Sequence, residues 1–345
     1  MHTLASIPLA TRTTLRLGGP AAELVEVESE ADLVDVVRAA DESGRPLLVL
    51  GGGSNLVVDD DGFEGLVVAV RTRGIEVDSD ACSGATVRVA AGEPWDEFVA
   101  TALQEGWVGV EALSGIPGLV GATPIQNVGA YGQEIAETIA SVRAWDRRAG
   151  EVRTIAAADC GFGYRTSRFK TDPEAFVVLS VTFQFRLGDL GAPIRYAELA
   201  RRLGVEVDER VPAKDVREAV LGLRRGKGMV LDEADHDTWS AGSFFTNPVV
   251  GADVAQRLAP GAPQWAQPDG SVKISAAWLI GQAGYEKGTL RGNVGLSTKH
   301  ALALTNRGGG TTAELLALAR EIRDTVHQRS GVVLVNEPVT VGCRL

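Results

Sequence analysis

The chain has 345 residues, of which 23% are charged, and its formal net charge at pH 7 is −11. This length suggests two or three domains with sizeable cores, and the acidic balance argues against wholesale nucleic-acid binding. Glycine is unusually common at 41 positions, but 14 prolines and no Gly-X-Y period exclude collagen and a disordered linker. The excess instead favours backbone that turns tightly or approaches something closely.

The cysteines and histidines indicate no metal site. Three cysteines lie far apart without a CxxC pair, and four histidines are isolated without an HExxH motif. Neither a disulfide framework nor a zinc site is therefore indicated. Residues 1–13 lack a charged segment followed by a long apolar run, and no 18 consecutive residues are apolar. We therefore expect a cytoplasmic protein without membrane insertion.

The first 72 residues predict a small α/β domain. Residues 22–28 mostly alternate apolar and polar side chains, which is typical of a half-buried strand. Ser29 can cap a helix over 30–40. An apolar strand follows over 47–50, and another strand over 66–71 comes after a glycine-rich loop.

The next region predicts strands on either side of a long glycine-rich stretch. Strands are expected over 75–78, 86–90, 140–146 and 176–186, and an amphipathic helix over 95–105. Residues 109–135 hold too many glycines and prolines for a long helix.

The last region predicts two helices with short elements between and after them. One helix runs over 213–223. The other begins at a capping box, Thr311 to Glu314, and its apolar stripe extends to Val326. Strands are expected over 332–335 and 339–341.

The loop GGGSN after the strand at 47–50 fails the test for a Rossmann fingerprint. That fingerprint needs a helix directly after the loop, whereas three aspartates, a glycine and a strand follow here. Successive N–H groups of Gly51, Gly52 and Gly53 could form an anion-binding nest. An ordinary tight turn explains the segment equally well.

The stretch 114–132 favours a planar ligand. Its five glycines let backbone lie flat against a large ring, and Gln126 and Asn127 offer donors and acceptors for a heteroaromatic edge. The alternative is a long surface loop. Interleaved apolar residues such as Ile116 and Val120 weaken that alternative, because they indicate partial burial.

Six blocks in chain order resemble the UDP-N-acetylenolpyruvoylglucosamine reductase family. They are LVLGGGSNLVV (48–58), EALSGIPGLVGATPIQNVGAYGQEI (111–135), GYRTSRFK (163–170), AGSFFTNPVV (241–250), AAWLIGQAGYEKG (276–288) and LVNEPVTVG (334–342). The resemblance implies an α+β chain with a vanillyl-alcohol-oxidase-type (PCMH-type) FAD-binding fold and a C-terminal substrate-binding domain. The implied division is 1–72 and 73–212 for two FAD-binding subdomains, with 332–345 returning to the second, and 213–331 for substrate.

The same resemblance implies where FAD lies. Its pyrophosphate would sit on 51–56 and its flavin ring against 114–132, in agreement with the two loops singled out above. The implied cofactor-binding residues are Gly51, Gly52, Gly53, Ser54, Asn55, Leu56, Ser114, Gly115, Ile116, Pro117, Gly118, Gly121, Ala122, Gln126, Asn127, Gly129, Tyr131 and Arg224. For Arg224 the alternative is a basic helix end that favours its own dipole.

The implied reaction reduces the enolpyruvyl ether of a UDP-sugar to UDP-N-acetylmuramate. NADPH reduces the flavin, flavin N5 gives a hydride to the alkene, and the carbon beside the carboxylate then needs a proton. Arg165 would hold the carboxylate, since its planar fork matches one. Ser243 would donate the proton, and Glu337 would assist. The alternatives are a solvated arginine, a serine in a turn and a strand-end carboxylate.

The substrate contacts are also carried over from the resemblance. Tyr196 looks like the clamping tyrosine of the family's longer subtype, although a packed aromatic explains it too. Tyr164 would line the channel shared by NADPH and the UDP-sugar, and Lys227 would face the diphosphate. Asn247 and Gln282 look like sugar or phosphate contacts, or else structural amides. We further expect a monomer.

Two other functions are compatible with parts of the sequence. A flavin oxidoreductase of the same fold that acts on an alcohol or sugar lactone would need a base, which the trio of Ser243, Arg165 and Glu337 does not favour. A nucleotide-sugar binding protein without catalysis would not need the flavin loops, and it would be colourless.

Overall fold

The computed structural model describes residues 2–80 and 84–345. The chain divides into two compact units. Unit 1 comprises Met1–Ile7, Ala21–Gly52 and Glu64–Gly226, and unit 2 comprises Pro8–Pro20, Gly53–Phe63 and Lys227–Leu345. The three-domain division expected from the sequence stays a prediction.

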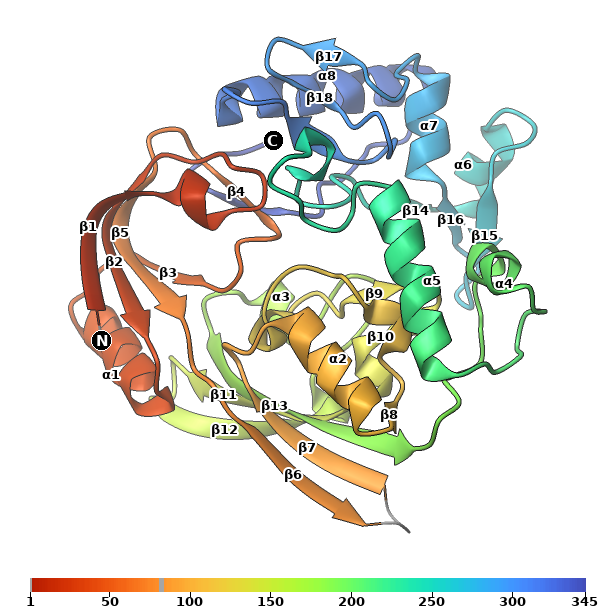
Figure 1. Cartoon of the computed structure of the whole chain (residues 1–345). Helices are drawn as coiled ribbons and strands as arrows, with labels where there is room; N and C mark the ends of the chain where they lie inside the picture. Colours follow the sequence, from red (N-terminus) through yellow and green to blue (C-terminus); the bar gives the residue numbers. More distant parts are fainter. Residues whose placement is uncertain (1, 81–83) are drawn as a thin grey trace. The chain divides into compact units, whose positions relative to one another are not determined.

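The first sheet of unit 1 is formed by the N-terminal strands. Its order is β1-β2-β5-β3, and Figure 1 draws these strands in red to orange with helix α1 beside them. Ser29 caps α1 by accepting a hydrogen bond from the Asp32 N–H at 3.1 Å. The expected strands and helix are confirmed. The bounds are β2 Pro20–Val27, α1 Glu30–Glu42, β3 Leu47–Leu50 and β5 Phe63–Val70, and the sheet also contains β1 His2–Pro8, which the sequence did not predict.

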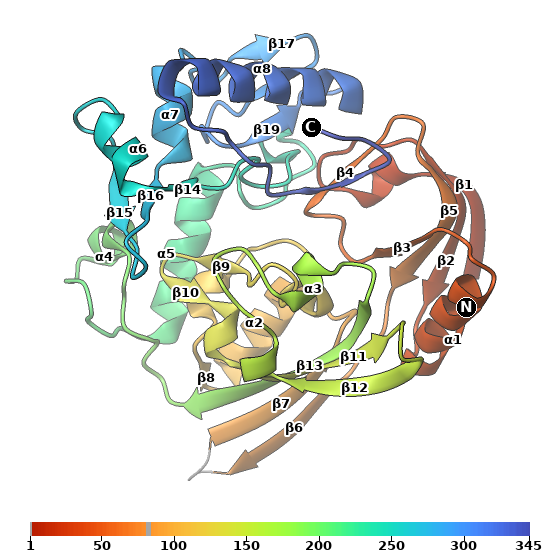
Figure 2. The same cartoon turned by 180° about the vertical axis from the view of Figure 1, so that it is seen from behind.

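The second sheet of unit 1 runs β12-β11-β13-β7-β6, and β8 also pairs with β13. Both views show these strands side by side (Figures 1 and 2). Helix α2 packs on this sheet through aromatic side chains. The rings of Phe98 and Phe183 stack with their centroids 5.1 Å apart. The bounds are β6 Ile75–Asp80, β7 Gly84–Ala90, α2 Trp95–Gln104, β8 Trp107–Val108, β11 Ile139–Asp146, β12 Glu151–Ala156 and β13 Phe176–Leu187.

The glycine-rich stretch contains only short elements among the described residues, so the prediction that it forms no long helix is confirmed. Helix α5 packs against it through a small apolar cluster in which Ala112 meets Val216, Ala219 and Val220. The remaining elements of unit 1 are η2 Glu111–Leu113, η3 Val120–Ala122, β9 Gly129–Ala130, β10 Gln133–Glu134, η4 Ile135–Glu137, η5 Ala157–Asp159, α3 Arg168–Thr171, α4 Ala197–Leu203 and α5 Ala213–Gly226.

Unit 2 is built from short strands and two principal helices. Its sheets are β14-β16-β15, β17-β18-β19 and the parallel pair β20-β4. Helix α8 has the expected capping box, in which Thr311 accepts the Glu314 N–H at 3.1 Å. The bounds are η1 Leu9–Arg12, β4 Leu56–Val58, η6 His236–Thr238, β14 Val249–Val250, α6 Ala252–Arg257, β15 Gln264–Ala266, β16 Val272–Ile274, α7 Ala276–Gln282, β17 Leu290–Arg291, β18 Val294–Leu296, β19 Leu304–Asn306, α8 Thr312–Ser330 and β20 Val339–Val341.

The strand expected over 332–335 is wrong. Val332 and Leu334 are buried and Val333 and Val335 are exposed, so the alternation does mark one buried face. The segment nevertheless makes no ladder, and only an isolated bridge between Phe245 and Asn336 follows it. The strand expected over 339–341 is confirmed as β20. Residues 332–345 belong to unit 2.

Candidate active site

The glycine-rich stretch is hydrogen-bonded along the start of α2. The N–H of Trp95 donates to the Gly118 carbonyl at 3.0 Å. In the other direction, the Val120 and Gly121 N–H groups donate to the carbonyls of Glu93 and Ala91, both at 2.9 Å. The stretch is therefore fixed by backbone bonds rather than suspended as a surface loop.

Close packing explains several glycines of unit 1. A Cβ added at Gly52 would lie 2.7 Å from the Cα of Gly118, and one added at Gly121 would lie 2.5 Å from the Cβ of Ala91. Real Cβ atoms do not approach that closely, so these positions require glycine. Gly51 differs, because its added Cβ would make ordinary contacts at 3.8 Å or more.

Three predicted site residues share a rare backbone conformation. Asn127, Tyr131 and Arg165 have φ angles of 46°, 49° and 53°. Left-handed φ values are uncommon outside glycine and cluster at functional sites. Their coincidence on three of the predicted residues supports a site in this part of unit 1.

The guanidinium of Arg165 lies against the end of the glycine-rich stretch. Its Nη2 donates to the Gly129 carbonyl at 2.6 Å, and its Nη1 to the Asn127 carbonyl at 3.4 Å. The ring centroid of Tyr164 is 5.6 Å from its Cζ, close enough for a cation–π contact. The charged fork is thus half-buried and oriented by the backbone.

Asn127 is buried, and its side chain bonds to the protein. Its Nδ2 donates to Glu134 Oε2 at 2.8 Å and to the Gly163 carbonyl at 3.1 Å, while its Oδ1 accepts the Ala136 N–H. These bonds connect the glycine-rich stretch to the hairpin that carries Arg165. The amide therefore shapes this part of unit 1.

Tyr131 and Tyr196 meet edge to face, with ring centroids 5.6 Å apart. Tyr196 directly precedes α4 and is 47% exposed, so its ring is available to a ligand. Burial raises the pKa of Tyr131 to about 12. Burial likewise lowers the pKa of Arg224, near the end of α5, to about 10, which leaves it charged at neutral pH.

Other predicted cofactor residues of unit 1 belong to the same stretch. Ser114 is buried and donates from Oγ to the Glu111 carbonyl at 2.7 Å. Ile116, Pro117, Ala122 and Gln126 are half-buried. Glu111, which the sequence analysis did not single out, is buried and accepts bonds from the Gly109 N–H and Gln133 Nε2.

In unit 2, the second half of the first glycine loop packs on other segments. Gly53 has φ +63°, and an added Cβ would lie 1.9 Å from the Arg12 carbonyl oxygen. The Asn55 carbonyl accepts the Val339 N–H at 2.9 Å. From Leu56 onward the chain forms β4, which pairs in parallel with β20. Ser54, Asn55 and Leu56 are half-buried.

Two predicted catalytic residues lie on paired segments of unit 2. The Glu337 N–H donates at 2.8 Å to the carbonyl of Phe244, the residue after Ser243. Glu337 also lies two residues before Val339, which binds Asn55. The structure thus gathers the segments of Ser243, Glu337 and Asn55 in one unit.

The predicted substrate residues of unit 2 are less closely grouped. Asn247 uses its Oδ1 to accept the Ala276 N–H at 2.9 Å, at the start of α7. Gln282 ends α7 and is exposed, and its carbonyl accepts a bond from Arg329 at 2.8 Å. Lys227 is half-buried just beyond α5.

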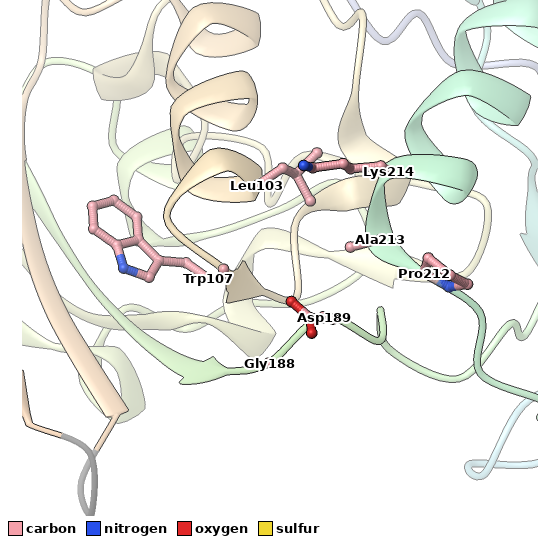
Figure 3. Close-up of a pocket in the computed structure, with 8 residues that line it drawn as sticks. Leu103, Trp107, Gly188, Asp189, Pro212, Ala213 and Lys214 are labelled. Carbon is pink, nitrogen blue, oxygen red and sulfur yellow. The ribbon is translucent and has the colours of Figure 1, made fainter.

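Neither a metal centre nor a membrane span is found among the described residues. They contain no group of three or more potential metal-binding side chains, and none of their helices is long and apolar enough to cross a bilayer. A cavity of about 220 Å³ lies in unit 1, and its lining includes no predicted site residue (Figure 3). Residues from the end of α2, β8 and the start of α5 line it, including Leu103, Trp107 and Lys214.

Comparison with known proteins decides the family. A model described as "FAD binding domain" matches residues 21–156, and one described as "UDP-N-acetylenolpyruvoylglucosamine reductase, C-terminal domain" matches residues 233–341. A reductase of that name from Cutibacterium acnes is 56% identical over 98% of this chain and 90% of its own length. Another, from Thermobifida fusca, is 57% identical over 99% and 98%. The chain belongs to the UDP-N-acetylenolpyruvoylglucosamine reductase family.

Family membership confirms the predicted enzyme class, a flavin-containing oxidoreductase of peptidoglycan synthesis. The crystal structure of UDP-N-acetylenolpyruvylglucosamine reductase from Thermus caldophilus shares the fold, with a TM-score of 0.67 and 24% identity over 99% of this chain and 98% of that one. Together with the FAD binding domain, it confirms the predicted fold class.

Proposed function

We propose that this chain reduces UDP-N-acetylglucosamine enolpyruvate to UDP-N-acetylmuramate, with FAD as its cofactor and NADPH as the reductant. The similarity over nearly the whole length to reductases of the family carries this proposal. The arrangement of the predicted residues within each unit supports it.

The residues present fit FAD. In unit 1, the backbone contact of Gly52 with Gly118 brings the two glycine-rich segments side by side. In the same unit, Gly115 and Gly118 have positive φ angles of 72° and 123°, which glycine adopts readily. Such a surface lets a ring system lie against backbone, so we assign the flavin to 114–132 and the pyrophosphate to 51–56.

The chain's own residues would act on the enolpyruvyl group. Bound FAD supplies hydride transfer, from NADPH and then to the terminal alkene carbon. Arg165 would hold the carboxylate with its fork. Ser243 would give a proton to the carbon beside that carboxylate, and Glu337 would assist one of these two residues.

The remaining assignments are also proposals. Lys227 would contact the diphosphate, and Tyr164 would line the channel shared by NADPH and the UDP-sugar. Tyr196 would clamp the substrate, and Gln282 would contact its sugar or phosphate. Because the Asn247 side chain bonds to α7, its proposed contribution includes holding that helix start in place. The cytoplasmic location and the monomeric state stay predictions.

Separate half-reactions of Ser243→Ala test this proposal. We expect unchanged reduction of the flavin by NADPH, and a loss of about 10²–10⁴-fold in reoxidation by the enolpyruvyl UDP-sugar, the range for a positioned proton donor. Ser330→Ala is the matched control, because that hydroxyl lies at the end of α8, where it donates to the Val326 carbonyl at 2.7 Å. Equal slowing of both half-reactions would show that Ser243 is structural.

Flavin content and NADPH oxidation separate the two rival functions. The purified protein should be yellow, and NADPH oxidation should require the enolpyruvyl UDP-sugar. A colourless protein that binds the nucleotide sugar would support a binding protein. A yellow protein that oxidises an alcohol or sugar lactone and ignores the UDP-sugar would support the other oxidoreductase.

A further inference from the structure

Asp96 makes three hydrogen bonds at the start of α2. Its Oδ1 accepts the Gly115 N–H at 2.6 Å and Arg217 Nη1 at 2.6 Å, and its Oδ2 accepts Arg217 Nη2 at 2.9 Å. Parallel bonds from one guanidinium to both carboxylate oxygens form a bidentate pair. One carboxylate therefore connects a glycine-rich segment to a helix 121 residues further along the chain.

The hydrogen bond that holds Gly115 comes from a side chain, whereas those that hold Gly118 and Gly121 come from the backbone. Gly118 and Gly121 are held by backbone groups at 94–95 and 91, which any sequence supplies. Gly115 is buried, has φ +72° and is held by a side chain. The conformation at Gly115 thus depends on a replaceable residue.

Arg217 brings α5 into the same arrangement. Its side chain is 20% exposed, and Asp96 is 38% exposed. Arg224 lies two turns further along α5, about 10 Å along the axis, and its charge also acts on Asp96. Asp96 therefore joins two elements of unit 1 that carry predicted cofactor residues, the glycine-rich stretch and the helix with Arg224.

We propose that Asp96, paired with Arg217, is a positioning residue that holds the backbone around Gly115 in the conformation that binds the flavin cofactor. This inference rests on the proposed function. Burial alone would raise the pKa of Asp96, but the bonds from Arg217 and Gly115 outweigh it and lower that pKa. The carboxylate is therefore ionised at neutral pH, as the pairing requires.

The test measures the dissociation constant of FAD from the folded apoprotein by flavin fluorescence. Asp96→Asn keeps the shape of the side chain but turns one oxygen into a donor that faces Arg217. We expect about tenfold weaker FAD binding, as for a half-buried donor of Arg217 left poorly satisfied. Arg217→Met should weaken FAD binding by a smaller factor. In the double variant it should add little to the effect of Asp96→Asn, since both substitutions remove the same ion pair.

Asp172→Asn is the matched control. Asp172 accepts the Arg148 fork with the same pair of lengths, 2.6 and 2.9 Å, but this pair is more exposed, and its two side chains bond to each other rather than to the glycine-rich stretch. The FAD affinity of the Asp172→Asn variant should stay within about twofold of wild type, because exposed ion pairs contribute little to stability.

A second measurement is hydrogen exchange of the apoprotein peptide that contains Gly115. Asp96→Asn should speed exchange there more than near Gly121, whose N–H binds backbone. Unchanged FAD affinity in Asp96→Asn would overturn the inference, because a merely structural bond changes the unfolding midpoint but not the affinity of folded protein. A wild-type protein that binds no FAD would instead overturn the proposed function.

Discussion

The two units hold their predicted site segments by different means. In unit 1, long strands form two sheets, and the glycine-rich stretch is bonded to 91–95 mainly through backbone groups. In unit 2, strands of two or three residues alternate with loops. Buried polar side chains connect these loops, as Asp237 and Asn306 do.

This difference predicts where each unit is sensitive to substitution. Where backbone meets backbone, the vulnerable residue is a glycine, because any side chain separates the two segments. Where a polar side chain holds the segments, the vulnerable residue is that side chain, because its loss leaves buried donors unsatisfied. The following predictions test this contrast.

The largest effect is expected from Asp237→Ala in unit 2. The carboxylate is 5% exposed, and it accepts bonds from the Thr298 N–H at 2.8 Å, from the Thr298 hydroxyl and from Arg307 at 2.6 Å. Removing one partner of a buried pair costs about 3–5 kcal/mol, and the 27% exposure of the Arg307 side chain places this loss at the lower end, about 3 kcal/mol. Urea unfolding measures the loss in the free energy of unfolding, and hydrogen exchange shows whether the loss is confined to unit 2.

Asp253→Ala is the control for that prediction. Asp253 forms an exposed i,i+4 pair with Arg257 on α6, and such a pair contributes about 0.3–0.5 kcal/mol. Similar losses for Asp237→Ala and Asp253→Ala would contradict the importance of buried side-chain bonds in unit 2.

Acid should weaken the bonds that the Asp237 carboxylate accepts. Burial acts to raise the pKa of Asp237, but the bonds from Thr298 and Arg307 lower it to about 2, whereas an unfolded aspartate titrates near about 3.9. The stabilisation is therefore complete above the unfolded pKa and is lost as the pH falls toward 2. The stability difference between wild type and Asp237→Asn should narrow from pH 6 to pH 3 in urea titrations; a constant difference would contradict this assignment.

A neighbouring pair of glycines tests unit 1. Gly52→Ala places a Cβ 2.7 Å from the Gly118 Cα, while Gly51→Ala places one in ordinary contact with Leu119 and Ala122. Overpacking of this kind costs about 1–3 kcal/mol, so only Gly52→Ala should lower the unfolding midpoint of the apoprotein substantially. Equal midpoints for the two variants would show that the two backbones separate at little cost.

Local patterns predicted the elements well, and distant contacts account for what they missed. Periodicity and caps located α1, α2, α8 and the long strands, because each depends on neighbouring residues. The alternation at 332–335 reported burial but not a pairing partner, so the expected strand is wrong. The contact of Asp96 with Arg217 spans 121 residues, and nothing in either local pattern indicates it.

The predicted site shows the same limit. Composition drew attention to the glycines at 51–53 and 114–132, but the reason for Gly52 and Gly121 is contact with Gly118 and Ala91. A tight turn or a bound ligand would also require glycines at these positions, so the sequence alone does not distinguish these causes. Asn127 was singled out for its amide, and only the structure shows that its side chain bonds to Glu134 and Gly163.

The smallest contrast concerns the helix starts of the two units. Ser29 caps α1 with a local bond, whereas Asp60 of unit 2 reaches the start of α8 from a distant loop and accepts the N–H groups of Thr312 and Ala313 at 2.7 and 2.9 Å. Ser29→Ala should cost about 1 kcal/mol. Asp60→Ala should cost about 1–2 kcal/mol, since it removes two acceptor contacts and a charge that favours the helix dipole.

Hydrogen exchange at the two helix starts distinguishes these losses. Asp60→Ala should also speed exchange in β4, because the Thr312 hydroxyl binds the Val58 carbonyl and ties α8 to that strand. Ser29→Ala should affect only the first turn of α1. Faster exchange confined to the first turn of the helix in each variant would show that Asp60 acts only as a helix cap. The difference between the two units would then not include the helix starts.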